Sequence, residues 1–183
     1  MRVAAGSAKG LELRVPPGRS VRPTTSLTRR GLFSMLESAG CRCESVLDLF
    51  AGSGALGIEA LSRGASHAVF VDRNRASCDA IRSNIARTGF KDRSQVLRVP
   101  ATRALDVVEG PYDTVFLDPP YDDPSAGKVL AALAGGRLLE TDAIVAIVHG
   151  DRHPLEESYG DLILWKTRRY GDSHVAIYRR EEQ

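Results

Sequence analysis

Two short segments of this chain hold the residue types that are best suited to chemistry. Residues 46–54, Val-Leu-Asp-Leu-Phe-Ala-Gly-Ser-Gly, predict a buried strand that runs into a glycine turn. Residues 118–121, Asp-Pro-Pro-Tyr, end a second apolar stretch with a carboxylate, two prolines of fixed φ and an aromatic ring. The first segment is typical of a loop whose backbone touches a nucleoside cofactor. The second is typical of a site that holds a flat base carrying an amine.

The glycine turn is predicted to form one side of a cofactor pocket. Ligands of open α/β sheets bind beyond the carboxyl ends of the strands, where glycine lets the backbone approach them closely. Asp72 ends the next predicted strand, 18 residues after Gly54, close to the usual spacing for an acid that binds ribose hydroxyls. Asp48 stands just before the turn, where its carboxylate can receive an ammonium group or order a water beside a sulfonium.

Other interpretations of these residues remain open. Gly52, Gly54 and Gly57 satisfy the pattern Gly-x-Gly-x-x-Gly, which also indicates a dinucleotide site. Asp48 can instead be a helix cap or a buried acceptor, and Asp72 an ordinary turn residue at a strand end. We favour S-adenosylmethionine because Asp48 precedes the turn and because Asp-Pro-Pro-Tyr is foreign to hydride-transfer enzymes.

Asp-Pro-Pro-Tyr suits the transfer of a methyl group to an exocyclic amine. An activated methyl donor needs little acid–base chemistry, but the lone pair of the delocalised nitrogen must be aimed. Asp118 and the Pro119 carbonyl can each accept one N–H of the amine, and consecutive prolines keep these acceptors in place. Tyr121 would stack on the base, which must be flipped out if it lies in a helix. The alternative is that Asp-Pro-Pro only ends a strand.

Length, composition and cysteine content predict one globular domain in a reducing compartment. The chain has 183 residues, 43% of them hydrophobic and 26% charged. The longest apolar run, around residues 143–148, is too short to span a bilayer, and no apolar leader is visible. The three cysteines are an odd number, and Cys41-x-Cys43 has no second Cys or His pair at ligand spacing. We therefore expect a cytoplasmic monomer with no membrane contact and no metal.

Basic residues concentrate at the N-terminus. Residues 1–42 hold eight Arg or Lys against two Glu, whereas the other 141 residues hold 17 against 21 Asp or Glu, out of 25 and 23 in the whole chain. Seven of the eight cations are Arg, which makes planar, bidentate contacts with phosphate. This end of the chain is expected to contact a polyanion, unless it is only a solvated arm.

From residue 45 onward, strand and helix patterns alternate, which predicts a Rossmann-like, doubly wound α/β fold. We expect a seven-stranded, mostly parallel sheet with strands over 46–50, 67–71, 95–99, 114–117, 144–148, 162–167 and 174–179, the last two forming an antiparallel hairpin. Helices are expected over 55–63, 76–88 and 129–133; the direction of Asn84 is open, and a solvated side chain is favoured over a functional one. This catalytic domain, 43–183, follows a small basic extension, 1–42, with a short hairpin over 3–15 and a helix over 26–38 capped by Thr25 or Ser26.

With these motifs in place, the sequence resembles the RsmD family, the 16S ribosomal RNA (guanine-N2)-methyltransferases of the class I S-adenosylmethionine-dependent fold. The resemblance covers nearly the whole chain. It rests on residues 46–65, on Asp-Pro-Pro-Tyr at 118–121, on Arg-Pro-Thr-Thr at 22–25, on Ala-Gly at 5–6 and on Arg-Tyr-Gly-Asp at 169–172. The tetrad alone is shared with many amino methyltransferases, including adenine-N6 DNA enzymes. Its combination with Arg-Pro-Thr-Thr is more specific.

The resemblance implies a cofactor, a substrate and the residues that meet each of them. S-adenosyl-L-methionine would be bound by Asp48, Phe50, Ala51, Gly52, Ser53, Gly54, Asp72, Arg73 and Ala101. The guanine amine of 16S rRNA, free or in an assembling 30S subunit, would be held by Asp118, Pro119, Pro120 and Tyr121. The RNA would be contacted by Arg22, Thr24, Thr25 and Arg29.

Four residues depart from the family pattern, and two other functions fit the motifs. The departures are Arg30, Ser34, Pro100 and His149, where an acid, an amide, an Asp and a Glu are usual. Backbone near Ala101 would replace the missing Asp. One rival function is an adenine-N6 methyltransferase acting on DNA, although the arm is small and no DNA-recognition domain is evident. The other is a non-catalytic module that binds RNA or a nucleotide.

Overall fold

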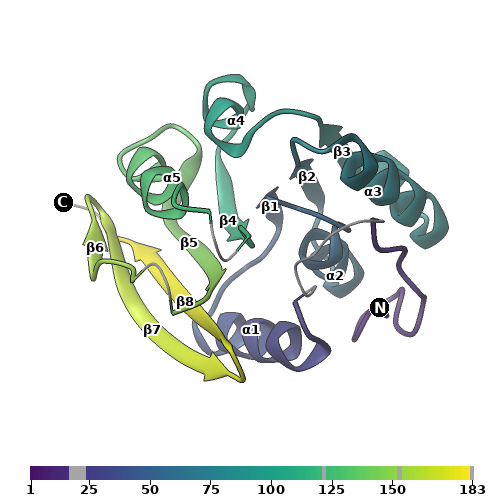
Figure 1. Ribbon diagram of the computed structural model, residues 1–183, viewed down its shortest axis with the longest axis horizontal. Helices are drawn as coiled ribbons and strands as arrows, with labels where there is room; N and C mark the ends of the chain where they lie inside the picture. The colour runs from purple at the N-terminus through teal and green to yellow at the C-terminus, as the bar shows by residue number, and fades with distance from the viewer. Residues whose placement is uncertain (17–23, 121–122, 152–153, 182–183) are drawn as a thin grey trace.

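The computed structural model of the chain describes residues 1–16, 24–120, 123–151 and 154–181. Its centre is an eight-stranded sheet in the order β3-β2-β1-β4-β5-β8-β7-β6 (Figure 1). The strands are β1 (Ser45–Leu49), β2 (His67–Val71), β3 (Ser94–Leu97), β4 (Tyr112–Leu117), β5 (Leu139–His149), β6 (Ser158–Tyr159), β7 (Leu162–Tyr170) and β8 (Ser173–Arg180). β1 to β5 pair in parallel, and β8, β7 and β6 pair antiparallel. The expected α/β class is confirmed, with one two-residue edge strand, β6, beyond the seven strands expected.

Helices cover both faces of this sheet (Figure 1). One face packs against α1 (Ser26–Ser38), α2 (Ala55–Arg63), α3 (Arg75–Thr88) and part of the N-terminal segment. The other face packs against α4 (Ala101–Val107) and α5 (Ala126–Leu133). Successive strand residues serve opposite layers, and all six residues of β4 are buried. A strand covered on both faces reads as a continuous apolar run, which is why β4 shows no alternation.

The helices that carry clear end signals lie where the sequence places them. α1 begins after Thr25, whose side chain accepts a hydrogen bond from the Thr28 N–H at 3.1 Å. α2 ends at Gly64, and α3 ends at Gly89, both with positive φ. These three helices match their expected bounds to within a residue.

The fold differs from expectation at α4 and at β5. α4 was not predicted, because it follows Pro100 without a side-chain cap and buries only Ala101 and Ala104. The short hairpin expected over 3–15 is present: an antiparallel bridge joins Arg2 to Glu12, and the N–H groups of Val3 and Leu13 donate to the Leu11 and Met1 carbonyls. β5 begins five residues earlier than expected, because Leu139 pairs with Tyr112 ahead of an irregularity in the ladder. Within the described ranges, no helix is both long and apolar enough to cross a membrane.

Candidate active site

Strand register brings three loops together at one edge of the sheet. The chain runs from β1 outward through β2 to β3 and returns to β4 on the other side of β1, so the strand order reverses between β1 and β4. Leu49, the last residue of β1, pairs with Val71 of β2 and with Leu117 of β4. The segments that follow these three strands therefore emerge side by side. Open α/β sheets bind ligands in the crevice at such a reversal.

The loop between β1 and α2 is built on left-handed backbone. Phe50, Gly52 and Gly54 have φ values of +60°, +59° and +77°. The Ala51 N–H donates to the Val71 carbonyl at 2.9 Å, which ties the loop to β2. The N-cap residue of α2 is Gly54, which has no side chain to cap the first turn of the helix. The loop thus brings backbone close to the crevice, as the glycine pattern predicts.

The third glycine of Gly-x-Gly-x-x-Gly has a packing role. A Cβ added to Gly57 would lie 2.4 Å from the ring of Phe70 in β2, so only glycine lets α2 approach the sheet this closely. A Cβ on Gly54 would lie 3.3 Å from its nearest neighbours. Close approach of α2 to β2 therefore accounts for Gly57, and the pattern needs no dinucleotide to explain it.

Asp72 fixes the loop from the end of β2. Its Oδ2 accepts the Gly52 N–H at 2.9 Å, and its Oδ1 accepts the Asn74 N–H at 2.8 Å. The side chain is buried, and each carboxylate oxygen can accept more than one hydrogen bond. Asp72 is therefore placed beside the glycine turn as expected, in contact with the turn itself.

Asp48 is a buried acid with an unsatisfied oxygen. It is 1% exposed, and its Oδ2 accepts the Gly57 N–H at 3.0 Å, whereas no described group hydrogen-bonds to Oδ1. Burial raises the pKa of Asp48 to about 8; the Gly57 hydrogen bond opposes this, and the charges of Asp118 and Asp72 reinforce it. A nearby cation would stabilise the carboxylate. The unsatisfied oxygen thus fits the ammonium group of S-adenosylmethionine.

The acceptor side of the crevice begins at Asp118, directly after β4. The Thr24 hydroxyl donates to Asp118 Oδ2 at 2.5 Å, across 94 residues of sequence. Pro119 is buried and Pro120 is half-buried. Asp123, His149 and Leu155 line a small hollow next to both prolines. Burial lowers the pKa of His149, whose Nδ1 lies 3.0 Å from the Gly150 carbonyl.

The remaining predicted residues fall into three groups. Phe50, Ala51 and Ser53 lie in the β1–α2 loop, Arg73 is exposed directly after Asp72, and Ala101 is buried at the start of α4. Thr25 caps α1, and its hydroxyl is hydrogen-bonded to Thr28. Arg22 and Tyr121 lie outside the described residues. Among the residues that are described, no three His, Cys, Asp or Glu side chains gather in a way that could hold a metal ion.

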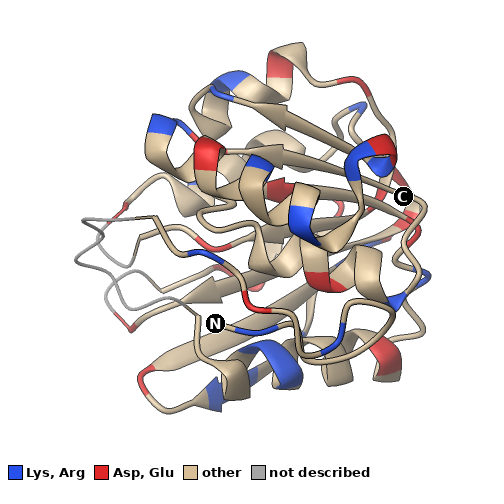
Figure 2. Ribbon diagram, turned by 90° about the vertical axis from the view of Figure 1, so that its right-hand side faces the viewer, with Lys and Arg blue, Asp and Glu red and all other residues tan. Residues whose placement is uncertain are grey.

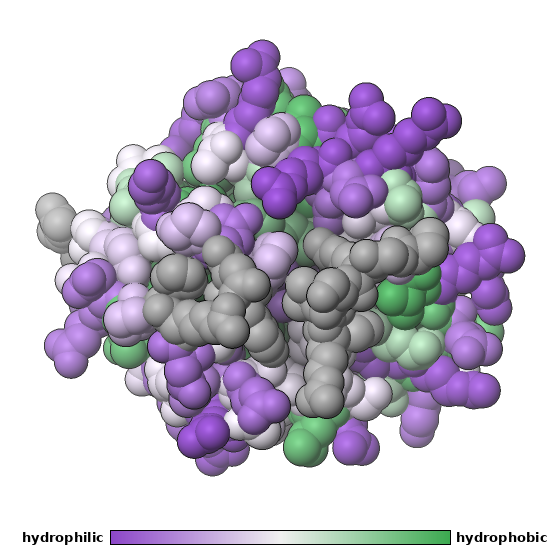
Figure 3. All heavy atoms as spheres, viewed as in Figure 1, coloured by the Kyte–Doolittle hydropathy of each residue, from purple (hydrophilic) through white to green (hydrophobic). Residues whose placement is uncertain are grey.

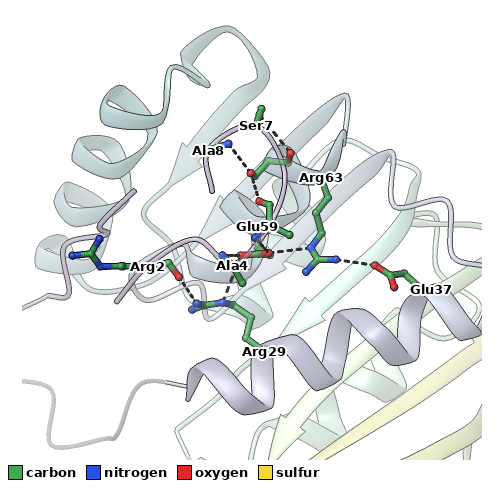
Figure 4. Close-up of polar contacts among 10 residues, drawn as sticks. Arg2, Ala4, Ser7, Ala8, Arg29, Glu37, Glu59 and Arg63 are labelled. Carbon is green, nitrogen blue, oxygen red and sulfur yellow. Dashed lines mark hydrogen bonds and ion pairs between the residues drawn. The ribbon is translucent and has the colours of Figure 1, made fainter. Parts of the chain in front are cut away.

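Arg29 does not lie where an RNA contact requires it. It is 1% exposed, its Nε lies 3.7 Å from Glu59 Oε2, and another of its nitrogens donates to the Arg2 carbonyl (Figure 4). The prediction that Arg29 contacts RNA is therefore wrong, because its guanidinium is buried between α1, α2 and the N-terminal segment.

Asn84 is the polar residue that sequence reasoning misplaced. It is 0% exposed and bonds to Arg14 and to the Ser53 carbonyl of the glycine loop. The helical pattern held a signal for this position, because Asn84 lies three residues after the buried Ile81 and beside Ile85, on the apolar stripe of α3.

Comparisons with known proteins agree with this geometry. A family model described as "Conserved hypothetical protein 95" matches residues 1–179. YlbH of Bacillus subtilis is 39% identical over 98% of this chain and 99% of its own length. "Ribosomal RNA small subunit methyltransferase D" of Escherichia coli is 30% identical over 100% of this chain and 91% of its own. The solved structure of Escherichia coli yhhF, 30% identical, superposes with a TM-score of 0.83 over 100% of this chain and 99% of its own.

The chain belongs to the RsmD family. The family model and the relatives span nearly the whole sequence, which confirms the resemblance drawn from residues 46–65 and 118–121. The protein is accordingly an S-adenosylmethionine-dependent methyltransferase in fold and in enzyme class.

Proposed function

We propose that this protein is a cytoplasmic monomer that transfers the methyl group of S-adenosylmethionine to the exocyclic N2 of a guanine in the 16S rRNA of the small ribosomal subunit. The observation that carries the proposal is the pairing of Leu49 with both Val71 and Leu117. This pairing puts the loop after β1, which would bind the nucleoside, beside the segment after β4, which would bind the amine. The name of the Escherichia coli relative supports ribosomal RNA as the substrate class.

On the cofactor side, both backbone groups and carboxylates would contact S-adenosylmethionine. The loop at 50–54 and the N–H of Ala101 would contact the nucleoside, Asp72 would accept the ribose hydroxyls, and Asp48 would meet the ammonium group. Arg73 is exposed next to Asp72 and would lie near the rim. When bound, the cofactor supplies a methyl group already activated on a sulfonium, so none of these side chains has to create a strong nucleophile.

On the substrate side, Asp118 would orient the amine. Its carboxylate and the Pro119 carbonyl would accept the two N–H bonds, which directs the nitrogen lone pair toward the methyl group. Thr24 donates to Oδ2 of the same carboxylate, so the Arg-Pro-Thr-Thr segment meets Asp-Pro-Pro-Tyr at one atom. The ring of Pro120 restricts the backbone of Pro119 before it, and Tyr121 would stack on the base. Alignment of this kind contributes several kcal/mol to catalysis.

The surface suits a polyanionic partner. Figure 2 shows Lys and Arg on the N-terminal segment and on neighbouring helices. The face seen in Figure 3 is mostly hydrophilic, with hydrophobic residues in small separate groups. We propose that residues 1–42 form the RNA-contacting extension of the catalytic domain, 43–183. Arg22, Thr24, Thr25 and the exposed Arg30 would make the contacts.

Methyl transfer to three nucleic acids tests this proposal. Tritiated S-adenosylmethionine is incubated with the protein and with 30S particles, protein-free 16S rRNA or duplex DNA. We expect label in ribosomal RNA, recovered as N2-methylguanosine. Label confined to DNA would instead establish an adenine-N6 enzyme. Cofactor binding without transfer to any of the three would indicate a non-catalytic binding module.

A further inference from the structure

The N-terminal segment is fixed to the domain rather than extended into solvent. The Glu59 carboxylate of α2 accepts the N–H groups of Ala4 and Ala5 at 2.7 and 3.0 Å, and it also binds Arg63 (Figure 4). Glu59 is 1% exposed, so these bonds are shielded from water. Val3, Ala8 and Leu13 are buried in the core formed by α1, α2 and the sheet. Residues 1–14 are therefore part of the folded domain.

Gly6 makes this docking close. The Ser7 N–H donates to the Ser62 carbonyl at 2.8 Å, and the Ala8 N–H donates to the Ser62 hydroxyl at 2.9 Å. A Cβ added to Gly6 would lie 1.8 Å from the Ser62 carbonyl oxygen. Gly10, in the same segment, has a similar φ, +85° against +80°, but a Cβ there would meet nothing within 4 Å. An alanine at either glycine would therefore have a similarly unfavourable φ, but only at Gly6 would its Cβ collide with α2 and disrupt the docking.

One buried amide links this segment to the glycine loop. Asn84 Oδ1 accepts the Arg14 N–H at 2.7 Å, and Asn84 Nδ2 donates to the Arg14 carbonyl at 2.9 Å. The same Nδ2 donates to the Ser53 carbonyl at 2.9 Å. All three bonds use a side chain that is 0% exposed, so water does not replace them. Because Nδ2 donates to two carbonyls and Oδ1 accepts an N–H, these partners also fix which end of the Asn84 amide is nitrogen and which is oxygen.

Ser53 lies between the two left-handed glycines of the loop, Gly52 and Gly54. We propose that Asn84 is a positioning residue that makes the docking of residues 1–14 and the affinity of this loop for the cofactor depend on each other. The inference rests on the cofactor site proposed above. If the segment leaves, Asn84 loses its Arg14 partners and no longer holds the Ser53 carbonyl in one place. If the cofactor orders the loop, the same amide is held for Arg14.

The link reaches the substrate side as well. Arg14 is fixed beside the cofactor loop, and ten residues later Thr24 donates to Asp118. Both ends of this stretch are thus tied to the two sides of the crevice. The proposed coupling between docking of residues 1–14 and cofactor affinity is reciprocal by thermodynamic necessity.

The first test uses the unmodified protein. Hydrogen exchange of residues 1–16 is measured with and without saturating S-adenosylhomocysteine, whose binding is followed by calorimetry. We expect slower exchange at Arg14 and its neighbours when the ligand is bound. Binding that leaves exchange throughout residues 1–16 unchanged would overturn the inference, and this readout needs no variant to fold.

The second test compares Gly6→Ala with Gly10→Ala. Gly6→Ala undocks the segment at a point that does not belong to the crevice, and we expect it to weaken S-adenosylhomocysteine binding about tenfold, the effect of roughly one lost hydrogen bond. Gly10→Ala should stay within about twofold of the unmodified protein, because its Cβ meets nothing. Equal affinities for the two variants, with faster exchange of residues 1–16 only in Gly6→Ala, would contradict the coupling.

Asn84→Ala tests whether the Asn84 amide couples the docking of residues 1–14 to cofactor affinity. It should weaken cofactor binding and also speed exchange of residues 1–16, and adding Gly6→Ala to it should weaken binding little further. Additive losses would mean that the link runs elsewhere. None of these measurements involves RNA. A wrong target nucleotide would leave them intact, whereas absence of ligand binding to the unmodified protein would remove the cofactor site itself.

Discussion

At the scale of single residues, three carboxylates share one crevice but have different surroundings. Asp72 is held by two backbone N–H groups, Asp48 by one, and Asp118 by the Thr24 hydroxyl. Asp48 has the least solvent of the three, and burial raises its pKa to about 8. The sequence placed Asp72 and Asp118 at strand ends and Asp48 just before the glycine turn. Only the fold shows which of them is held by backbone and which by a side chain from the N-terminal segment.

Asp118→Ala should abolish methyl transfer while leaving the cofactor site intact. Loss of a positioned acceptor is expected to lower kcat by about 100-fold or more. The Kd for S-adenosylhomocysteine should change by less than about threefold, because Asp118 is proposed to contact the amine and not the cofactor. Asp118→Asn keeps one acceptor oxygen and should retain more activity than Asp118→Ala. Near-normal turnover in the alanine variant would remove Asp118 from the mechanism.

Asp48→Asn should change how stability depends on pH. Folding raises the pKa of Asp48 from 3.8 to about 8, which means that the folded protein binds this proton more tightly than the unfolded chain does. The resulting contribution to the free energy of unfolding is fully present below pH 3.8 and is lost as the pH rises through about 8. Between pH 6 and pH 9 the cofactor-free wild type should lose roughly 2–3 kcal/mol relative to Asp48→Asn. Urea unfolding at both pH values measures the difference. The exposed Asp106→Asn is the matched control and should keep the wild-type slope.

At the scale of elements, local signals explain most of the fold. Thr25, Gly64 and Gly89 set the ends of α1, α2 and α3, and each is a residue type that favours its cap position. α4 was missed because it has no cap and buries few apolar side chains. Where local chemistry is strong, the pattern was enough to predict the element.

Long-range polar contacts were not predictable in this way. Arg29 and Asn84 are polar residue types that usually lie at the surface, yet both are buried, and their partners come from distant parts of the chain. Asn84 meets Arg14 across 70 residues of sequence. The sequence predicted the glycine loop after β1 and the position of Asp118 after β4, but not the contacts that join the N-terminal segment to both.

Gly57→Ala should destabilise the protein through the packing of α2 on β2. The added Cβ would lie 2.4 Å from the Phe70 ring, and such overpacking costs about 1–3 kcal/mol. A smaller side chain at the same contact should relieve it, so Gly57→Ala with Phe70→Leu should cost less than the sum of the two single changes. Urea unfolding of all four proteins tests this. Additive losses would show that the contact does not limit the approach of the helix.

At the scale of the whole molecule, one hydrogen bond joins the N-terminal region to the proposed methyl-acceptor site. Thr24 joins them directly, because its hydroxyl contacts Asp118. Arg22 stands two residues before it in sequence, and Arg30 is exposed on α1. Arg29, by contrast, forms an ion pair with Glu59 inside the domain. The basic residues that lie close in sequence to Thr24, which contacts Asp118, are therefore the ones expected to hold RNA.

Replacing Arg22 and Arg30 with Ala should weaken RNA binding and its dependence on salt. Each lost phosphate contact reduces the slope of log K against log salt concentration by about 1. Filter binding of 16S rRNA at several salt concentrations measures the slope. Arg103→Ala, an exposed change on α4 against the opposite face of the sheet, is the matched control and should leave the slope unchanged. An unaltered slope in the double variant would leave the basic arm as an ordinary solvated surface.

The most direct measurement of the central claim is the nucleoside composition of 16S rRNA from cells that lack this protein. Mass spectrometry should show the loss of one N2-methylguanosine, which returns with the wild-type chain but not with Asp118→Ala. Unchanged N2-methylguanosine, with the missing modification found at another base or in DNA, would contradict the assignment of guanine N2 as the methyl acceptor.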